Sequence, residues 1–417
     1  MNLSKRREKR RKMKRLKGNV LYGQSGGPTS VINASGYGLF KEAFSNKDIV
    51  EHVYAMHFGI EGLLENDLIE VFNNKELEKL CYTPGAYFGS NRYKLEKTEK
   101  AKTDLARILE VFKKYNIRYF FYNGGNDSMS SCYEISNYLS KSGYECCCIG
   151  IPKTIDNDLL YCDHTPGYGS AAKYIANAIA EIYYDDHSYK NGRVNVVEVM
   201  GRNAGWLTAS SKLAKLCGAE PDLIYVPEVA FDLDNFLKRV HSIYEKKHHC
   251  LVVISEGIKN SDNLNIFQES KRMDAFNHIQ LGGVSNFLVE KIEHEFKYKT
   301  RAFELSLLQR ANTMLISKVD LKEAIKVGKF AFQEAIKGKT NKMIIIKRIS
   351  NNPYKIKLST FSLEQIKNNE RLLPLEYIDQ KNKTINDSFI DYVYPLIQGE
   401  VNNRINNGLI QTIKLEK

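Results

Sequence analysis

An apolar stretch, Cys146–Ile151, ends in Pro152 and is followed by Lys153 and two carboxylates, Asp156 and Asp158. The apolar run indicates a buried strand that Pro152 ends, so the charged residues are expected on the loop beyond its carboxyl end. In open α/β sheets, ligands bind at that end of the strands. A lysine beside paired carboxylates suits phosphoryl transfer, because it combines a positive charge, a base for a hydroxyl and an oxygen ligand for a metal ion. Taken alone, these residues also fit an ordinary strand-to-helix loop with an Asp cap.

Two upstream loops have the same strand, glycine pair and helix arrangement. The first follows a predicted strand at 19–23 and reads QSGGPTS, and the second follows a predicted strand at 117–122 and reads NGGNDS. Glycine lets a backbone approach an anion, and the free N–H groups and dipole of a helix start favour phosphate. Each loop alone would fit a structural turn. Together with the Lys153–Asp158 loop, we expect them to line one crevice.

Further candidate binding residues, most of them charged, follow other predicted strands or glycine loops, where arginine side chains can clamp phosphate oxygens. They are Arg92 after residues 84–91, Met200, Gly201 and Arg202 after a strand at 193–199, Glu256 after a strand at 250–255, and Arg301 and Arg310 further on. Strands alternate with predicted helices at 206–217, 233–247, 284–297 and 319–337. This alternation predicts parallel, doubly wound α/β sheets.

Composition narrows the class of protein. A chain of 417 residues with 43% apolar and 26% charged residues is typical of a globular protein with more than one domain. No apolar run approaches the length that crosses a bilayer. The charged N-terminus has no apolar segment typical of a signal peptide, which predicts a cytoplasmic protein. The eight cysteines contain no C-x-x-C pattern and are therefore expected to be reduced thiols.

The net charge of +12 is concentrated at the N-terminus, where ten Lys/Arg and one Glu between Lys5 and Lys17 supply +9. Residues 1–17 are therefore predicted to form a disordered basic arm, and the remaining body is nearly neutral. Such an arm can contact RNA, another acidic polymer or an anionic surface. No aromatic side chains interleave the charges to stack on bases, so nucleic-acid contact through residues 5–17 stays open but is not favoured.

Together these motifs resemble the phosphofructokinase family. They run in family order over roughly residues 18–345, as QSGGPTSVIN, GSNR, GGNDS, PKTIDND, TPGYGSAAKY, VVEVMGRNAGW, SEG and LLQR. An ordered set of this length is far more specific than any single motif. The resemblance implies an α/β fold of two Rossmann-like doubly wound domains, with the active site in the cleft between them and a C-terminal appendage. It also implies a homodimer or homotetramer.

The resemblance divides the chain into four parts. After the arm, residues 18–165 plus about 310–348 would bind the phosphoryl donor, residues 166–309 would bind fructose 6-phosphate, and residues 349–417 would form the appendage. The activity implied is phosphorylation of the sugar 1-hydroxyl with Mg2+ as the cofactor.

Two residues indicate which donor this relative uses. ATP-using relatives read GGDGS and PGTIDND, whereas this chain has Asp127 and Lys153 in place of two of those glycines. Asp127 would place a carboxylate where the α-phosphate of ATP must lie, and Lys153 would supply a cation for the transferred group. The resemblance is therefore to the pyrophosphate-dependent type. An ATP-dependent enzyme and a catalytically inactive regulatory or RNA-binding relative stay open as alternatives.

The resemblance also implies roles for individual residues. Asp156 would be the general base, with Lys153, Arg202 and Asp127 completing the catalytic set. Pyrophosphate would contact Gly26, Gly27, Arg92, Gly125, Asn126 and Asp127. The sugar phosphate would contact Thr154, Ile155, Asp156, Arg193, Met200, Gly201, Arg202, Glu256, Arg301 and Arg310, with some of the arginines coming from a neighbouring subunit. Asn126 and Asp158 would hold the metal.

Two positions depart from the family pattern. Asn126 is neutral where many relatives have a metal-binding Asp, so Mg2+ would depend more on pyrophosphate oxygens. Leu307 occupies a position where relatives often have His or Tyr near the 6-phosphate, so that part of the pocket would be built differently.

Overall fold

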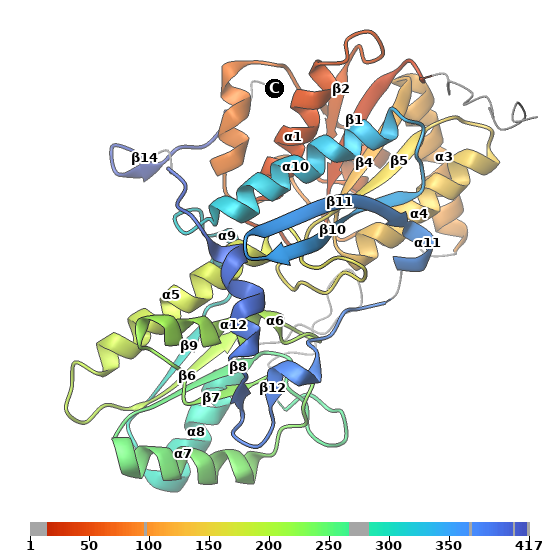
Figure 1. Ribbon diagram of the computed structural model, residues 1–417. Helices are drawn as coiled ribbons and strands as arrows, with labels where there is room; N and C mark the ends of the chain where they lie inside the picture. The colour runs from red at the N-terminus through yellow and green to blue at the C-terminus, as the bar shows by residue number, and fades with distance from the viewer. Residues whose placement is uncertain (1–14, 96–97, 267–282, 367–368, 403–404, 415–417) are drawn as a thin grey trace, which may run out of the picture.

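The computed structural model describes residues 15–95, 98–266, 283–366, 369–402 and 405–414. The predicted basic arm up to residue 14 lies outside the described residues. The chain forms two α/β halves, and its C-terminal residues run across both of them (Figure 1).

The first half is built on a seven-stranded sheet in the order β11-β10-β5-β4-β1-β2-β3. Its strands are β1 (Asn19–Gln24), β2 (Val53–Met56), β3 (Leu68–Glu70), β4 (Ile117–Gly124), β5 (Cys147–Pro152), β10 (Lys342–Asn351) and β11 (Tyr354–Ser362). The inner pairs are parallel, and only the edge strands β3 and β11 pair antiparallel with their neighbours. The helices of this half are α1 (Ile32–Phe44), α2 (Ile60–Glu65), α3 (Glu99–Lys114), α4 (Asn126–Lys141), α10 (Lys318–Ala335) and α11 (Leu363–Ile366).

Strand β4 is buried at almost every position because helices cover both faces of the sheet. Successive side chains of a strand point to opposite faces. Tyr119 and Phe121 accordingly pack in the core that includes α1 and α10, whereas Phe120 and Tyr122 pack in the core that includes α3 and α4. Burial on both faces holds the sheet rigid beneath the loops at its ends.

The chain order reverses between β1 and β4: β2 and β3 lie on one side of β1, and β4 lies on the other. Such a switch point leaves a crevice at the carboxyl ends of the two strands. The glycine pairs Gly26-Gly27 and Gly124-Gly125 stand there. The N-cap residue of α4 is Gly125, which has no side chain to cap the helix, so backbone N–H groups of the first turn face the crevice.

The second half has a four-stranded parallel sheet in the order β7-β8-β6-β9. Its strands are β6 (Val194–Val199), β7 (Leu223–Tyr225), β8 (Cys250–Ser255) and β9 (Thr300–Glu304). Its helices are α5 (Tyr168–Asp186), α6 (Trp206–Ser210), α7 (Leu233–Lys247), α8 (Val284–Phe296) and α9 (Leu308–Ala311). One mainly parallel and one fully parallel sheet, both joined by helices, confirm the predicted α/β fold class.

The C-terminal residues belong to both halves. Residues 354–362, which the sequence assigned to the appendage, form β11 of the first sheet. Helix α12 (Ser388–Val393) packs its aromatic side chains in the second core, where Tyr392 lies 5.3 Å from Trp206 between ring centroids. Two short hairpins complete this part, β12 (Ile378–Asp379) with β13 (Thr384–Ile385) and β14 (Ile405–Asn406) with β15 (Leu409–Ile410). The remaining domain boundaries stay a prediction.

The described residues contain no helix long and apolar enough to cross a membrane. All eight cysteines are free thiols, as expected from the sequence.

Candidate active site

One cleft collects the carboxyl ends of strands from both halves. Most of the predicted site residues line it: Gly27, Arg92, Gly125, Asn126, Asp127, Lys153, Thr154, Ile155, Asp156, Asp158, Met200, Arg202, Glu256 and Arg310. Gly26 and Gly201 lie beside lining residues: a Cβ added to Gly26 would lie 3.4 Å from Lys153 Nζ, and Gly201 N donates to Glu256 Oε1 at 3.3 Å. The structure therefore brings together residues that are far apart in the sequence.

Lys153 is almost fully buried at the end of β5, and its Nζ donates to the carbonyl of Gly27 at 2.6 Å. Burial lowers the pKa of this ammonium to about 8, although the carboxylate of Asp156 raises it in part. At neutral pH the group stays mainly protonated. A Cβ on Gly27 would lie 2.6 Å from the guanidinium of Arg310, so glycine here lets a second cation approach the same loop.

Asp156 is held by Thr154, two residues before it. The Thr154 hydroxyl donates to Asp156 Oδ2 at 3.2 Å and accepts from Asp156 N at 3.1 Å. The next residue, Asn157, is buried with a φ of 57° and accepts from Thr165 N at 3.1 Å. These bonds fix the turn that aims the Asp156 carboxylate into the cleft, where a base must lie within hydrogen-bond reach of the hydroxyl it deprotonates.

Asn126 and Asp158 form a pair, with Asn126 Nδ2 donating to Asp158 Oδ2 at 3.0 Å. Burial, together with the carboxylates of Asp156 and Glu370, raises the pKa of Asp158 to about 8. Within the described residues, the Oδ1 atoms of Asn126 and Asp158 are buried and have no hydrogen-bond partner. Two buried oxygens without hydrogen-bond partners, one of them on a carboxyl group whose raised pKa disfavours the charged form, suit a hard cation.

Cationic side chains face these acids. Burial lowers the pKa of Arg92 and of Arg310, and each is lowered further by a neighbouring arginine. The Nε atom of Arg202 is buried with no acceptor among the described residues. Partial burial in the cleft also raises the pKa of Glu256, to about 7. Cations placed close together against their mutual repulsion favour an anionic ligand such as phosphate.

A family model described as phosphofructokinase matches residues 19–334 of this chain. The chain belongs to the phosphofructokinase family. A pyrophosphate–fructose 6-phosphate 1-phosphotransferase of Halomonas elongata is 41% identical over 96% of this chain and 96% of its own length. One of Xanthomonas campestris is 39% identical over 92% of each chain. The crystal structure of a pyrophosphate-dependent phosphofructokinase from Nitrosospira multiformis superposes with a TM-score of 0.85 at 36% identity, covering 95% of this chain and 96% of that one.

Sequence reasoning missed several residues of this phosphofructokinase cleft. Pro28, Ser128, Asn203, Ala204 and Glu370 also line it. Most of them neighbour predicted residues, so their place follows once the loops are known. Glu370 is different, because it comes from the C-terminal stretch in which the sequence shows no clear pattern.

Arg193 and Arg301 lie outside the cleft of their own chain. Arg193 directly precedes β6, and Arg301 stands near the start of β9 opposite Asn195, so both occupy the amino ends of strands whose carboxyl ends reach the site. Their predicted role in binding the 6-phosphate stays a prediction, and it requires a neighbouring subunit. Leu307, the other departure from the family pattern, is exposed beside α9.

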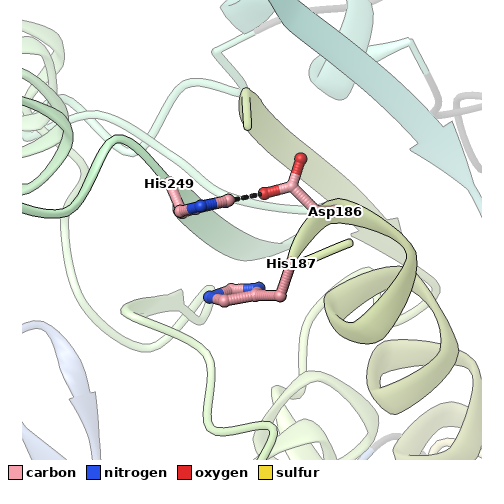
Figure 2. A group of neighbouring side chains, drawn as sticks. All are labelled: Asp186, His187 and His249. Carbon is pink, nitrogen blue, oxygen red and sulfur yellow. Dashed lines mark hydrogen bonds and ion pairs between the residues drawn. The ribbon is translucent and has the colours of Figure 1, made fainter. Parts of the chain in front are cut away.

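Asp186, His187 and His249 cluster near Arg193, with possible ligand atoms within 4.8 Å of one another (Figure 2). His249 Nδ1 bonds Asp186 Oδ2 at 2.6 Å, and the two histidine rings stack with centroids 4.2 Å apart and planes 14° apart. Ring nitrogens bind metals in the plane of the ring, so two stacked rings cannot aim at one ion. Asp186 Oδ1 accepts from Arg193 N at 3.1 Å, which makes the cluster an anchor for Arg193.

Proposed function

We propose that this chain transfers a phosphoryl group reversibly from pyrophosphate to the 1-hydroxyl of fructose 6-phosphate, giving fructose 1,6-bisphosphate and phosphate. The family membership and the relatives named above support the reaction. The observation that carries the donor assignment is buried Lys153, whose ammonium is anchored to Gly27 and lies in the same cleft as Asp156 and Asp127. A cation in this place stabilises charge on the transferred group and on the leaving phosphate.

In the proposed mechanism, the two substrates lie in the cleft so that the sugar 1-hydroxyl faces the donor in line. Asp156, oriented by Thr154, accepts the hydroxyl proton as the oxygen attacks phosphorus. Lys153 and Arg202 neutralise charge on the phosphoryl oxygens, and the released phosphate carries the bond electrons away. Arg92 and Arg310, which line the same cleft, hold the anionic oxygens of the substrates.

Asn126 and Asp158 would hold Mg2+, since each offers a buried oxygen with no partner among the described residues. The ion would supply neutralisation of pyrophosphate charge when bound. A carboxylate whose pKa is raised by burial and neighbouring acids regains its ordinary ionisation beside a cation, which couples Asp158 to the ion. The neutral amide of Asn126 makes this site weaker in charge than an Asp-Asp pair.

Arg193 and Arg301 support a homo-oligomeric enzyme. Arg193 is bonded to Asp186 and Arg301 is exposed, and neither lines the chain's own cleft. If they contact the 6-phosphate, they do so in the cleft of a second copy, so we propose a homodimer or homotetramer.

The test is the rate of fructose 1,6-bisphosphate formation from fructose 6-phosphate and Mg2+, with pyrophosphate and ATP supplied separately. We expect turnover with pyrophosphate. The double variant Asp127→Gly/Lys153→Gly should lose pyrophosphate turnover by on the order of 100-fold and gain measurable turnover with ATP, because the repelling carboxylate is gone. Turnover of the unaltered chain with ATP alone would overturn the donor assignment, and no turnover with either donor would overturn the enzymatic proposal.

A further inference from the structure

Residues 370–373, called the strap below, cross the wall of the active-site cleft. They lie between the Asp156 loop (residues 153–158) and the Arg202 loop (residues 200–206), which belong to different halves of the molecule. Glu370 itself lines the cleft beside Asp158 and Asn203. The strap comes from the C-terminal part of the chain, which has no assigned role in the reaction.

On one side the strap is bonded to the end of the Asp156 loop through its backbone. Glu370 forms an antiparallel bridge with Leu159, and Arg371 N donates to the carbonyl of Asp158 at 2.7 Å. A backbone bond of this kind does not depend on side-chain rotamers. The position of the strap is therefore coupled to the residue that the cleft presents as a metal ligand.

On the other side the strap is bonded to the Arg202 loop. Asn203 Nδ2 donates to both carboxylate oxygens of Glu370, at 3.0 and 3.3 Å. Trp206 Nε1 donates to the carbonyl of Arg371 at 3.0 Å. Glu228 adds an indirect link, because its Oε1 accepts from Gly205 N and from Leu373 N, each at 2.8 Å.

The side chain of Arg371 joins the same two regions again. Its guanidinium lies 4.1 Å from the ring centroid of Trp206, within the range of a cation–π contact. Its Nη1 donates to the carbonyl of Cys162 at 3.1 Å and to that of Asp163, in the segment that follows the Asp156 loop. The two loops thus share several partners in the strap.

We propose that the strap sets the position of the Arg202 loop relative to the Asp156 loop, with Glu370 and Asn203 as positioning residues. The proposal rests on the proposed function, in which Arg202 and Asp156 act on the same transfer from opposite halves. An error of about 1 Å in such an arrangement costs on the order of 100-fold in rate. Glu370 acts through Asn203 and holds no reacting atom.

The variants Glu370→Ala and Asn203→Ala each remove the side-chain link. We expect each to lower kcat by about 10- to 100-fold with little change in KM for fructose 6-phosphate or pyrophosphate, because positioning matters most in the transition state. The double variant should be no worse than either single variant, since both remove one bond. Glu370→Gln keeps an acceptor for Asn203 and should retain kcat within about 3-fold.

The matched control is Glu376→Ala, an exposed glutamate of the same C-terminal part that does not line the cleft. We expect wild-type kcat and KM from it. Additive losses in the double variant, or a Glu370→Gln variant as slow as Glu370→Ala, would overturn the proposal, because the bond between the two residues would then not be what positions the loop.

Trp206 provides a readout that needs no turnover, since it is the single tryptophan of the chain and bonds the strap directly. Without substrates, Glu370→Ala and Asn203→Ala should shift its emission to the red and increase its quenching by acrylamide, and Glu376→Ala should not. A Glu370→Ala variant that leaves either Trp206 fluorescence or kcat unchanged would overturn the proposal. Should the unaltered chain use ATP instead of pyrophosphate, the donor assignment alone would fall, and the same variants would be assayed with ATP.

Discussion

The carboxyl ends and the amino ends of the parallel strands carry similar polar side chains, but the two groups differ in whether their polar atoms have hydrogen-bond partners. At the carboxyl ends, Asn126, Asp158 and Arg202 have buried polar atoms with no partner among the described residues. At the amino ends of the second sheet, Asp186 is bonded to both Arg193 and His249. The first group is arranged for a ligand, whereas the second is satisfied by its own members. Residue type alone therefore does not identify a ligand site. Buried polar atoms that lack hydrogen-bond partners in the protein do.

The direction of the strands explains the difference. Helices that follow the strands begin at the carboxyl ends, so their N–H groups and positive dipole ends face the cleft, as α4 does after β4. The opposite edge receives helix ends such as that of α5 at Asp186, where the dipole repels anions. At the carboxyl ends of the strands, the fold itself favours a phosphate ligand. At the amino ends, only individual arginines favour one.

Removing the base should have the largest effect. Asp156→Asn keeps the shape of the side chain but cannot accept the sugar proton, so kcat should fall by on the order of 100- to 10,000-fold with little change in KM for fructose 6-phosphate. Initial rates of fructose 1,6-bisphosphate formation measure this directly. Asp262→Asn, at an exposed position, is the matched control and should behave as wild type. An Asp156→Asn variant with wild-type kcat would mean that the cleft is not where the proton is taken.

Much of this cleft could be predicted from the sequence because its residues follow recognisable local patterns. Lys153, Asp156 and Asp158 come directly after an apolar run that ends in Pro152, and a parallel sheet brings the ends of such runs to one edge. The glycine pairs before α1 and α4 were recognisable for the same reason. The chain direction also shows which end of a strand a residue occupies. Arg193 precedes its strand, so it could have been assigned to the amino-end edge of the sheet, away from the cleft.

Glu370 could not be predicted because nothing in its local sequence marks it. Its place in the cleft depends on a backbone bridge to Leu159 and a bond to Asn203, both of which are contacts between distant parts of the chain. Residues 354–362 present a similar difficulty: the sequence places them in the C-terminal appendage, and in the structure they form an edge strand, β11, whose pairing with β10 decides its place. Non-local pairing of this kind is settled by tertiary packing and leaves little trace in periodicity.

A smaller effect, on KM for fructose 6-phosphate, is expected from arginines at the amino ends of the second sheet. Arg193→Ala and Arg301→Ala should each raise KM for fructose 6-phosphate by about 10-fold or more and change kcat little, because a charge-assisted bond to phosphate contributes about 1.5–3 kcal/mol. Light scattering after size exclusion should find a homodimer or homotetramer. Arg107→Ala, at a surface position paired with Glu110, is the control. Unchanged KM in both variants, or a fully active monomer, would limit this edge to a structural role.

The smallest predicted effect is a change of stability with pH. It comes from His164, which pairs with Asp163 as His249 pairs with Asp186. His164 lies behind the Asp156 loop and contacts Asp163 Oδ1 at 2.7 Å and Glu323 Oε2 at 2.6 Å, with Arg348 and Tyr354 as further neighbours. Burial alone would lower the pKa of His164, yet the ion pairs with Glu323 and Asp163 outweigh it and raise the pKa to about 9.

Because the folded-state pKa lies above the unfolded value of about 6.5, the protonated His164 stabilises the fold fully below pH 6.5 and loses this contribution as the pH rises through about 9. Urea unfolding of the wild type should therefore lose up to about 3 kcal/mol between pH 6.5 and 9.5 relative to His164→Gln. His294→Gln, at an exposed position, should follow the wild type. Parallel pH profiles for the wild type and His164→Gln would mean that folding does not raise the pKa of His164. Asp163 would then depend on its bond with Arg348, and Glu323 on its bond with Tyr354, rather than on a charged His164.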